Sequence, residues 1–382
     1  AQVLMIILRC SPFGLQTRLD DYYEEIGQKE KTVSKQAFSK ARANLDPDIV
    51  RESFVRTAQA MSSCEDIELY RGKYRLCAID GSDLILDNAQ ELLEYFGGSG
   101  VNKDCVTALA SVCYDPLNDT ILDGGLYPYG TSERKAARKH FDAVSALPLP
   151  EGAENLYIFD RGYPSKELFA DMIDSNMVFL MRVRKKFHLD FDSAKGNAKV
   201  NFTHDGKQYR IRVFKVKLNG GEQELLVTNL RAKHLSRAEV ASLYFERWRI
   251  ETKFDTLKNK LQLENMSGRR VVTTYQDFWA KLDLANMIAA LGFATDDVIE
   301  QKNVDSCNKY AQTTNESRLI TKLADRYIEM LSRNDPDERR ALFDALVADI
   351  ARRPIEVKPN RQSARKLPRK KKFCDRRKPV LR

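Results

Sequence analysis

The spacing of apolar and polar residues changes several times along the chain, and each change predicts a different kind of element. The first 70 residues are polar and have helical periodicity. From Tyr74 onward, short apolar runs alternate with amphipathic stretches, which predicts strands and helices in turn and therefore an α/β core. Strands are expected at 74–80, 106–114, 120–127, 156–160 and 177–183, and helices at 132–147 and 165–176.

Residues 186–230 carry a third pattern, that of a small antiparallel sheet. Strands are expected at 198–204, 208–217 and 223–229. The dipeptides Asp205-Gly206 and Asn219-Gly220 stand between these runs and favour tight hairpin turns. We therefore expect a β-rich insertion within the α/β core.

The longest predicted helix covers residues 237–263. Ser236 and Glu239 have the spacing of a capping box, and Leu235 with Val240 that of a hydrophobic staple. Apolar residues recur within it at spacings of 7, 4, 3 and 4, which predicts one buried stripe. They are Leu243, Ile250, Phe254, Leu257 and Leu261.

These patterns divide the chain into five parts. A helical N-terminal region is a candidate for binding DNA, because residues 32–42 resemble the second half of a helix-turn-helix; an ordinary amphipathic helix is the alternative. The remaining chain is mostly helical from 275 to 350, with a break at Asn334-Asp335-Pro336. The parts are 1–70, a core of 71–185 with 235–300, the insertion 186–234, a helical region 301–350, and a tail 351–382.

Composition excludes several classes of protein. The longest apolar run has six residues, whereas a membrane-spanning helix needs about 20. Seven scattered cysteines without a CxxC pair argue against a disulfide framework or a zinc site, and for a reducing cytoplasm. The sequence begins with Ala1 rather than Met, which is consistent with residues missing upstream.

Positive charge is concentrated in the tail. Residues 352–382 contain 14 Lys and Arg against 2 Asp and Glu, a net charge of +12, while the other 351 residues carry a net charge of −3. Four prolines and few apolar residues predict that this segment is disordered when free. A nucleic acid is the expected partner, and a tail that only improves solubility is the alternative.

One face of the long predicted helix carries an unusual set of polar side chains. At about 100° per residue, Tyr244, Arg247, Glu251 and Lys258 fall within an arc of roughly 60°. A carboxylate would thus lie beside two cations and a phenol. The alternative is a solvated face, since Arg247 and Glu251 have the i,i+4 spacing of an ordinary ion pair.

Two further carboxylates follow apolar runs. Asp80 and Asp160 each lie close before a glycine, and the working residues of α/β sheets are commonly found just past strand ends. With Glu251 they would form a group of three carboxylates. Repulsion between each pair of negative charges at ~4 Å costs about 4 kcal/mol, so cations are required to neutralise them. Oxygen ligands suit Mg²⁺ or Mn²⁺, and two such ions assist phosphoryl transfer. Two alternatives remain open: Asp83 or Asp87 is the ligand in place of Asp80, and Asp160 caps a helix.

These residues resemble the insertion-sequence family 4 transposases. Tyr244-x2-Arg247-x3-Glu251-x6-Lys258 reproduces the YREK signature of that family. The segments Ala-Ile-Asp-Gly-Ser at 78–82 and Phe-Asp-Arg-Gly-Tyr at 159–163 resemble its first and second aspartate motifs. The resemblance covers about residues 33–300.

The resemblance implies an RNase H-like catalytic core interrupted by a β-rich insertion, with helical regions on both sides. It further implies that Asp80, Asp160 and Glu251 bind two Mg²⁺ or Mn²⁺ ions, and that Tyr244, Arg247 and Lys258 contact the phosphates of the element ends. Its partners would be double-stranded DNA, at inverted-repeat ends and at a target, and a second copy of the chain in a synaptic homodimer, in the cytoplasm. One departure is that Trp248 and Trp279 are the only tryptophans, and neither lies in the insertion.

The leading hypothesis is therefore a cut-and-paste DNA transposase. A catalytically inactive or truncated DNA-binding remnant of a transposase is the first alternative, and a nuclease of the same fold is the second. Histidine chemistry is not expected, because His140, His188, His204 and His234 show no metal or triad spacing.

Overall fold

The chain divides into two units in a computed structural model, which describes residues 2–9, 14–99, 105–194, 196–217, 223–231, 235–304 and 310–357. Unit 1 comprises Ala1–Thr57, Ile85–Val106 and Leu261–Arg382, and unit 2 comprises Ala58–Leu84 and Thr107–Lys260. The basic tail from residue 358 onward and the Asn219-Gly220 turn lie outside the described residues. The five-part division expected from the sequence stays a prediction.

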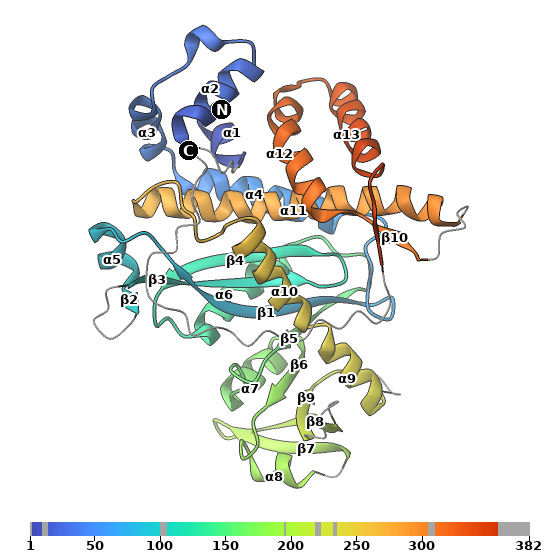
Figure 1. Ribbon diagram of the computed structural model, residues 1–382. Coiled ribbons are helices and arrows are strands. Elements are labelled where there is room, and N and C mark those ends of the chain that lie inside the picture. The colour runs from blue at the N-terminus through green and yellow to red at the C-terminus, as the bar shows by residue number, and fades with distance from the viewer. Residues whose placement is uncertain are drawn as a thin grey trace. The chain divides into compact units, whose positions relative to one another are not determined.

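Unit 2 is built on a large mixed sheet, so the predicted α/β class is confirmed. Its strand order is β4-β3-β1-β5-β6-β9-β8-β7 (Figure 1). The strands are β1 (Tyr74–Ile85), β3 (Cys105–Asp115), β4 (Thr120–Pro128), β5 (Glu154–Phe159), β6 (Val178–Val183), β7 (Asn197–His204), β8 (Lys207–Lys217) and β9 (Gln223–Thr228).

The central strands run parallel, and their register brings two sequence motifs together. β1 pairs with β5 from Tyr74↔Glu154 to Ile79↔Phe159, and β5 pairs in parallel with β6. The prediction that both aspartates end a strand is correct for Asp160 and wrong for Asp80. β1 continues past its last pair with β5 as far as Ile85, because β3 lies on its other side.

Two hairpins flank these parallel strands. β3 and β4 form the predicted antiparallel pair. Strands β7 and β8 are joined by Asp205-Gly206, both with positive φ (46° and 75°), as the predicted tight turn requires. β9 pairs antiparallel with both β8 and β6, so β7 to β9 continue the main sheet.

Apolar side chains point alternately to the two faces of this sheet, so a core forms on each face. Tyr157 and Phe159 of β5 join a cluster with α6 and α7, whereas Leu156 and Ile158 join a second cluster with α9. In Figure 1, α6 lies behind the strands and α10 in front of them. The helices are α6 (Glu133–Ser145), α7 (Lys166–Asp174), α8 (Leu189–Ser193), α9 (Arg237–Phe245) and α10 (Trp248–Asp255).

The single helix expected over 237–263 is wrong, although its start and its apolar stripe are confirmed. The Ser236–Glu239 capping box is present, and all five predicted stripe residues are buried. The helix is divided into α9, α10 and a π-helical turn, η2 (Thr256–Lys260). The N–H groups of Arg247, Arg249 and Ile250 bond to carbonyls three residues back, which tightens the helix there, and the π turn then widens it.

Unit 1 is mainly helical. Asp335 caps its last helix and Pro336 begins it, which confirms the predicted break. None of the described helices is apolar enough over a sufficient length to cross a membrane. The elements are α1 (Gln2–Leu8), α2 (Leu15–Glu25), η1 (Lys29–Lys31), α3 (Lys35–Ala43), α4 (Pro47–Ser62, whose last residues belong to unit 2), α5 (Gln90–Phe96), β2 (Gly98–Ser99), α11 (Val271–Val304), β10 (Gln312–Thr313), α12 (Glu316–Ser332), α13 (Pro336–Ile350) and β11 (Ile355–Glu356).

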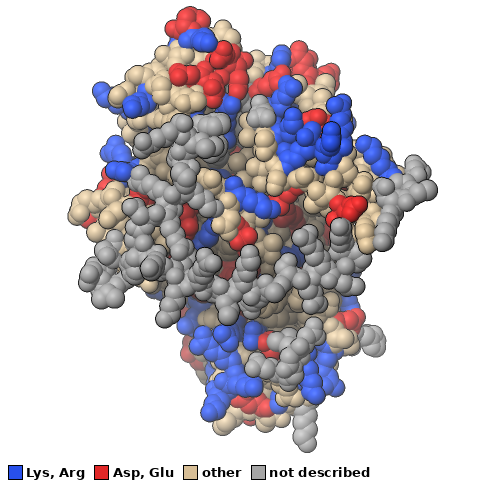
Figure 2. Space-filling view, viewed as in Figure 1, with Lys and Arg blue, Asp and Glu red and all other residues tan. Residues whose placement is uncertain are grey.

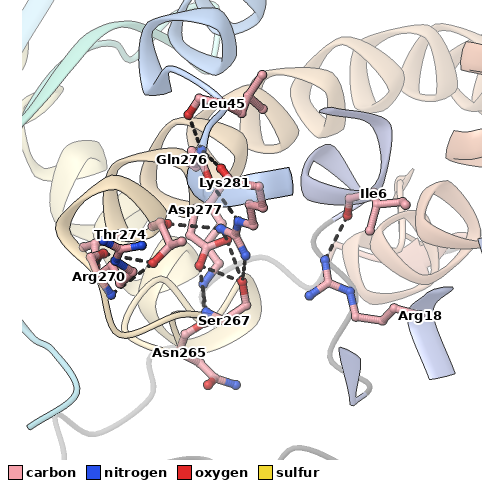
Figure 3. Close-up of polar contacts among 12 residues, drawn as sticks. Ile6, Arg18, Leu45, Asn265, Ser267, Arg270, Thr274, Gln276, Asp277 and Lys281 are labelled. Carbon is pink, nitrogen blue, oxygen red and sulfur yellow. Dashed lines mark hydrogen bonds and ion pairs between the residues drawn. The ribbon is translucent and has the colours of Figure 1, made fainter. Parts of the chain in front are cut away.

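A buried ion pair joins α3 to α11 within unit 1. Nη2 of Arg42 lies 2.8 Å from Oδ1 of Asp277, and both side chains are at least 93% buried. The guanidinium also donates to Gln276 and to the Thr273 carbonyl, and Asp277 accepts from Ser267, as part of the polar network in Figure 3. Arg42 falls in the segment that resembles a helix-turn-helix, but its side chain is committed to this internal contact.

A second buried carboxylate, Asp115 at the end of β3, makes the stability of unit 2 depend on pH. Burial raises its pKa to about 6, although hydrogen bonds from Asn118 and Leu117 lower it. The folded chain therefore holds this proton more tightly than the unfolded chain, in which an Asp has a pKa of about 3.9. This contribution to stability is complete below about pH 4 and is lost as the pH rises through 6.

We expect Asp115→Asn to remove this part of the pH dependence. Urea unfolding at pH steps from 4 to 7 measures the effect. Between these pH values the free energy of unfolding should fall less in the variant than in the wild type, by up to about 3 kcal/mol. Equal slopes for the two proteins would show that folding does not raise the pKa of Asp115.

Candidate active site

Asp80 and Asp160 lie next to each other where the pairing of β1 and β5 ends. Each directly follows a member of the last pair, Ile79↔Phe159. Oδ1 of Asp80 accepts from the N–H of Gly81 at 2.9 Å, and Oδ1 of Asp160 accepts from the N–H of Gly162 at 2.6 Å. The sheet thus sets the spacing of the two carboxylates, and the following glycines fix their orientation.

Arg247 connects Asp80 to the third predicted carboxylate, Glu251. Its Nη1 lies 3.7 Å from Oδ2 of Asp80, and its Nη2 lies 2.9 Å from Oε1 of Glu251. The Arg247 side chain is 5% exposed and its guanidinium lies over the rings of Tyr244 and Trp248. A buried cation is therefore held between two of the three predicted ligands.

The surroundings of Asp80 oppose its ionisation, chiefly because the side chain is buried. Burial raises its pKa to about 7, and the nearby Asp160 and Glu133 carboxylates add to this effect. Arg247 and the N–H of Gly81 act in the opposite direction. The balance shows that negative charge at this position is not fully compensated by the protein.

The fourth carboxylate, Glu133, was missed by the sequence reasoning. It is the first residue of α6, and its pKa is raised by burial and by the charges of Asp160 and Asp83. Nothing in the periodicity of α6 marks it, because an acidic residue in a first helical turn is common. Only the position of α6 beside the ends of β1 and β5 brings it to the site.

The donor set suits a divalent cation, although the side chains are not arranged as a finished metal site. Among the described residues, no three His, Cys, Asp or Glu side chains are close enough together to hold a metal ion. Carboxylates repel each other and lie apart unless a cation lies between them. Here the cation between Asp80 and Glu251 is the Arg247 guanidinium. Carboxylate oxygens as the only donors fit Mg²⁺ or Mn²⁺.

The other two predicted DNA-binding residues are Tyr244 and Lys258. Tyr244 is buried and its hydroxyl has no hydrogen-bond partner, while Lys258 donates to the Asp83 carbonyl at 2.6 Å. Of the two alternatives to Asp80, Asp87 is paired with Arg269 in unit 1, and Asp83 is exposed. Asp80 is the one that contacts Arg247.

Comparison with known proteins identifies the family. Residues 71–287, more than half of the chain, match the model of the transposase DDE domain. The chain belongs to the DDE transposase family. All six site residues predicted for the transposase lie within the matched range, as does Glu133.

Other comparisons add little. No curated protein matches the transposase sequence. Among solved structures, it is similar to a chain from the cryo-EM structure of a piggyBac transposase synaptic complex with hairpin DNA. That similarity has a TM-score of 0.43 and 11% sequence identity, and it covers 91% of this chain and 74% of the other. At this level the likeness is too low to define a fold or a function.

The transposase also has a basic groove on the sheet, at the end opposite to the carboxylates. Its volume is about 910 Å³, and it is lined by the first residues of β1, β5 and β6 and by parts of β7 to β9. Lys199 and Arg212 are paired across β7 and β8, so they share a face. The basic residues of the lining are Lys73, Lys199, Arg210, Arg212 and Arg231. Lys and Arg side chains are also frequent on the surface over β7 to β9 (Figure 2).

Proposed function

We propose that the transposase cuts DNA at the ends of its own element and joins the freed ends to target DNA, using Mg²⁺ or Mn²⁺ bound by Asp80, Asp160 and Glu251. One observation carries the assignment of the site. The register of β1 and β5 places Asp80 beside Asp160, and Arg247 links Asp80 to Glu251. The family membership supplies the class of reaction.

We further propose an RNase H-like core for unit 2. Strands β3 and β4 form a hairpin beside β1, and β5 and β6 continue the sheet in parallel. Strands β7 to β9 follow β6, and α9 and α10 then return the chain to the carboxylates. This order supports a catalytic core with a β-rich insertion between the second aspartate and the glutamate.

The protein's part in the reaction is to hold charges in fixed positions. Water attacks the phosphodiester at the element end, and the freed 3′-hydroxyl then attacks a phosphodiester of the target. Bound divalent ions would neutralise the phosphate and stabilise the attacking and leaving oxygens. Arg247 is buried and already oriented, so it can pair with a phosphate oxygen at little cost in side-chain entropy.

DNA is the proposed partner, in the cytoplasm, with two copies of the chain holding the two element ends. Tyr244 lies against the Arg247 guanidinium and Lys258 donates to the Asp83 carbonyl, and both are proposed to contact the end phosphates with Arg247. The basic groove on β7 to β9 supports this proposal, because five Lys and Arg side chains along one surface are suited to a phosphate backbone.

Removal of the metal tests the proposed reaction. A plasmid that carries the gene with its native flanking DNA is incubated with the protein in Mg²⁺ or in EDTA, and the break positions are mapped. We expect breaks at a pair of inverted repeats with Mg²⁺ and none with EDTA. DNA binding without breaks under both conditions would instead indicate an inactive remnant.

A further inference from the structure

Glu133 reaches the carboxylate cluster from a different element than the three predicted ligands. A Cβ atom on Gly162 would lie 3.0 Å from Oδ1 of Asp160 and 3.5 Å from Oε2 of Glu133. A Cβ atom on Gly81 would lie 3.4 Å from Cγ of Glu133. The Glu133 carboxylate therefore lies between the two glycine segments that orient Asp80 and Asp160. In the described part of the chain it forms no ion pair or hydrogen bond, and its residue is exposed.

The position of Glu133 is fixed by a buried row of hydrogen bonds further along α6. His140 is fully buried, with Nε2 at 2.8 Å from Oγ of Ser111 on β3 and Nδ1 at 2.7 Å from Oδ2 of Asp123 on β4. Substrate cannot reach these three buried residues, so we assign them no chemistry. They hold α6 against the hairpin, and its first turn then projects toward the ends of β1 and β5.

A buried hydroxyl without a hydrogen-bond partner lies near these carboxylates. Tyr163 follows Gly162 and is 0% exposed, yet its hydroxyl has no hydrogen-bond partner. Burial raises the pKa of this hydroxyl well above its usual value, and the charges of the Asp80, Glu133 and Asp160 carboxylates add to the effect. A buried hydroxyl without a partner is costly, which suits a group that would lie beside a bound ligand.

We propose that Glu133 is a fourth carboxylate of the cation site and binds the divalent ion together with Asp80 and Asp160. This inference rests on the proposed function, because that function supplies the ion. Glu133 is suited to the role since its carboxylate is accessible and unpaired, whereas Glu251 is already engaged by Arg247. A cation bound between α6 and the ends of β1 and β5 would remove the repulsion among the three carboxylates.

Binding of Mn²⁺, measured from the loss of the free-ion EPR signal, tests the proposal without relying on activity. We expect Glu133→Gln to weaken Mn²⁺ binding roughly ten- to a hundredfold, and Glu133→Asp to weaken it less. Asp142→Asn, which removes a charge from an exposed position on the same helix, is the matched control and should bind as the wild type does. Thermal unfolding without metal should show Glu133→Gln at least as stable as the wild type, because one repelling charge is gone.

Asp80→Asn separates this inference from the proposed function. If Asp80→Asn weakens Mn²⁺ binding and Glu133→Gln leaves it unchanged, the site exists but Glu133 is not part of it. If neither substitution changes Mn²⁺ binding, the proposed cation site and the role of Glu133 are both wrong.

Discussion

Glu251→Gln is expected to reduce DNA cleavage by roughly a thousandfold while leaving DNA affinity within about threefold of the wild type. Gln has the same shape and can still accept the hydrogen bond from Nη2 of Arg247, so α10 should keep its place. What is lost is the negative charge, which the proposed site needs in order to bind a cation. Cleavage rates under single-turnover conditions, and binding by fluorescence anisotropy at the same salt concentration, give the two quantities.

Asp255→Asn is the matched control for this prediction. Asp255 lies one helical turn further along α10 and is exposed, and its contact is a hydrogen bond from Asn259 that Asn can also accept. The control should cleave as the wild type does. If the two variants cleave equally well, Glu251 is not a catalytic carboxylate, and if both lose DNA binding, the charge of α10 acts in binding instead.

Asp277→Ala is expected to destabilise the fold by about 3–5 kcal/mol, because it leaves Arg42 charged and buried without its carboxylate. The loss extends beyond one ion pair, since Ser267 also loses the acceptor for its N–H. Burial by itself would raise the pKa of Asp277, but the charges of Arg42 and Lys281 lower it overall. The stabilisation is therefore present at neutral pH and is lost as the pH falls below the pKa of an Asp in the unfolded chain. Urea unfolding at pH 7 measures the effect.

An exposed ion pair provides the comparison. Glu52 and Arg56 on α4 are 58% and 74% exposed, and Glu52→Gln should change the unfolding free energy by less than about 1 kcal/mol. A loss for Asp277→Ala as small as that of Glu52→Gln would mean that Arg42 finds water or another acceptor once the carboxylate is removed.

Much of the fold and part of the site could be predicted because they depend on local patterns. Alternating residues and turn dipeptides predict the strands of the sheet, and the apolar runs before Asp80 and Asp160 place both residues near the end of the β1–β5 pairing. The extension of β1 beyond Asp80 could not be predicted, because it depends on a neighbouring strand distant in sequence. Likewise, the tightening at Arg247 and the π turn after Asp255 break the regular 100° periodicity on which the predicted helix face was based.

Glu133 shows what sequence patterns leave out. The predicted carboxylates could be recognised because two follow apolar runs and the third belongs to a spaced motif. Glu133 has neither feature, and its place beside Asp160 follows from the buried contacts of His140 seven residues later. Sites assembled from several elements are incompletely predicted when one contributor has no local pattern of its own.

The central claim is that this chain joins DNA ends and does not only cut them. The most direct test uses a labelled DNA fragment that ends in the free 3′-hydroxyl of the element, incubated with the protein, a target plasmid and Mg²⁺. We predict a covalent product of fragment and plasmid that disappears with EDTA and in each of Asp80→Asn, Asp160→Asn and Glu251→Gln. Cleavage of element ends without any joined product, or joining that persists in these variants, would contradict the account.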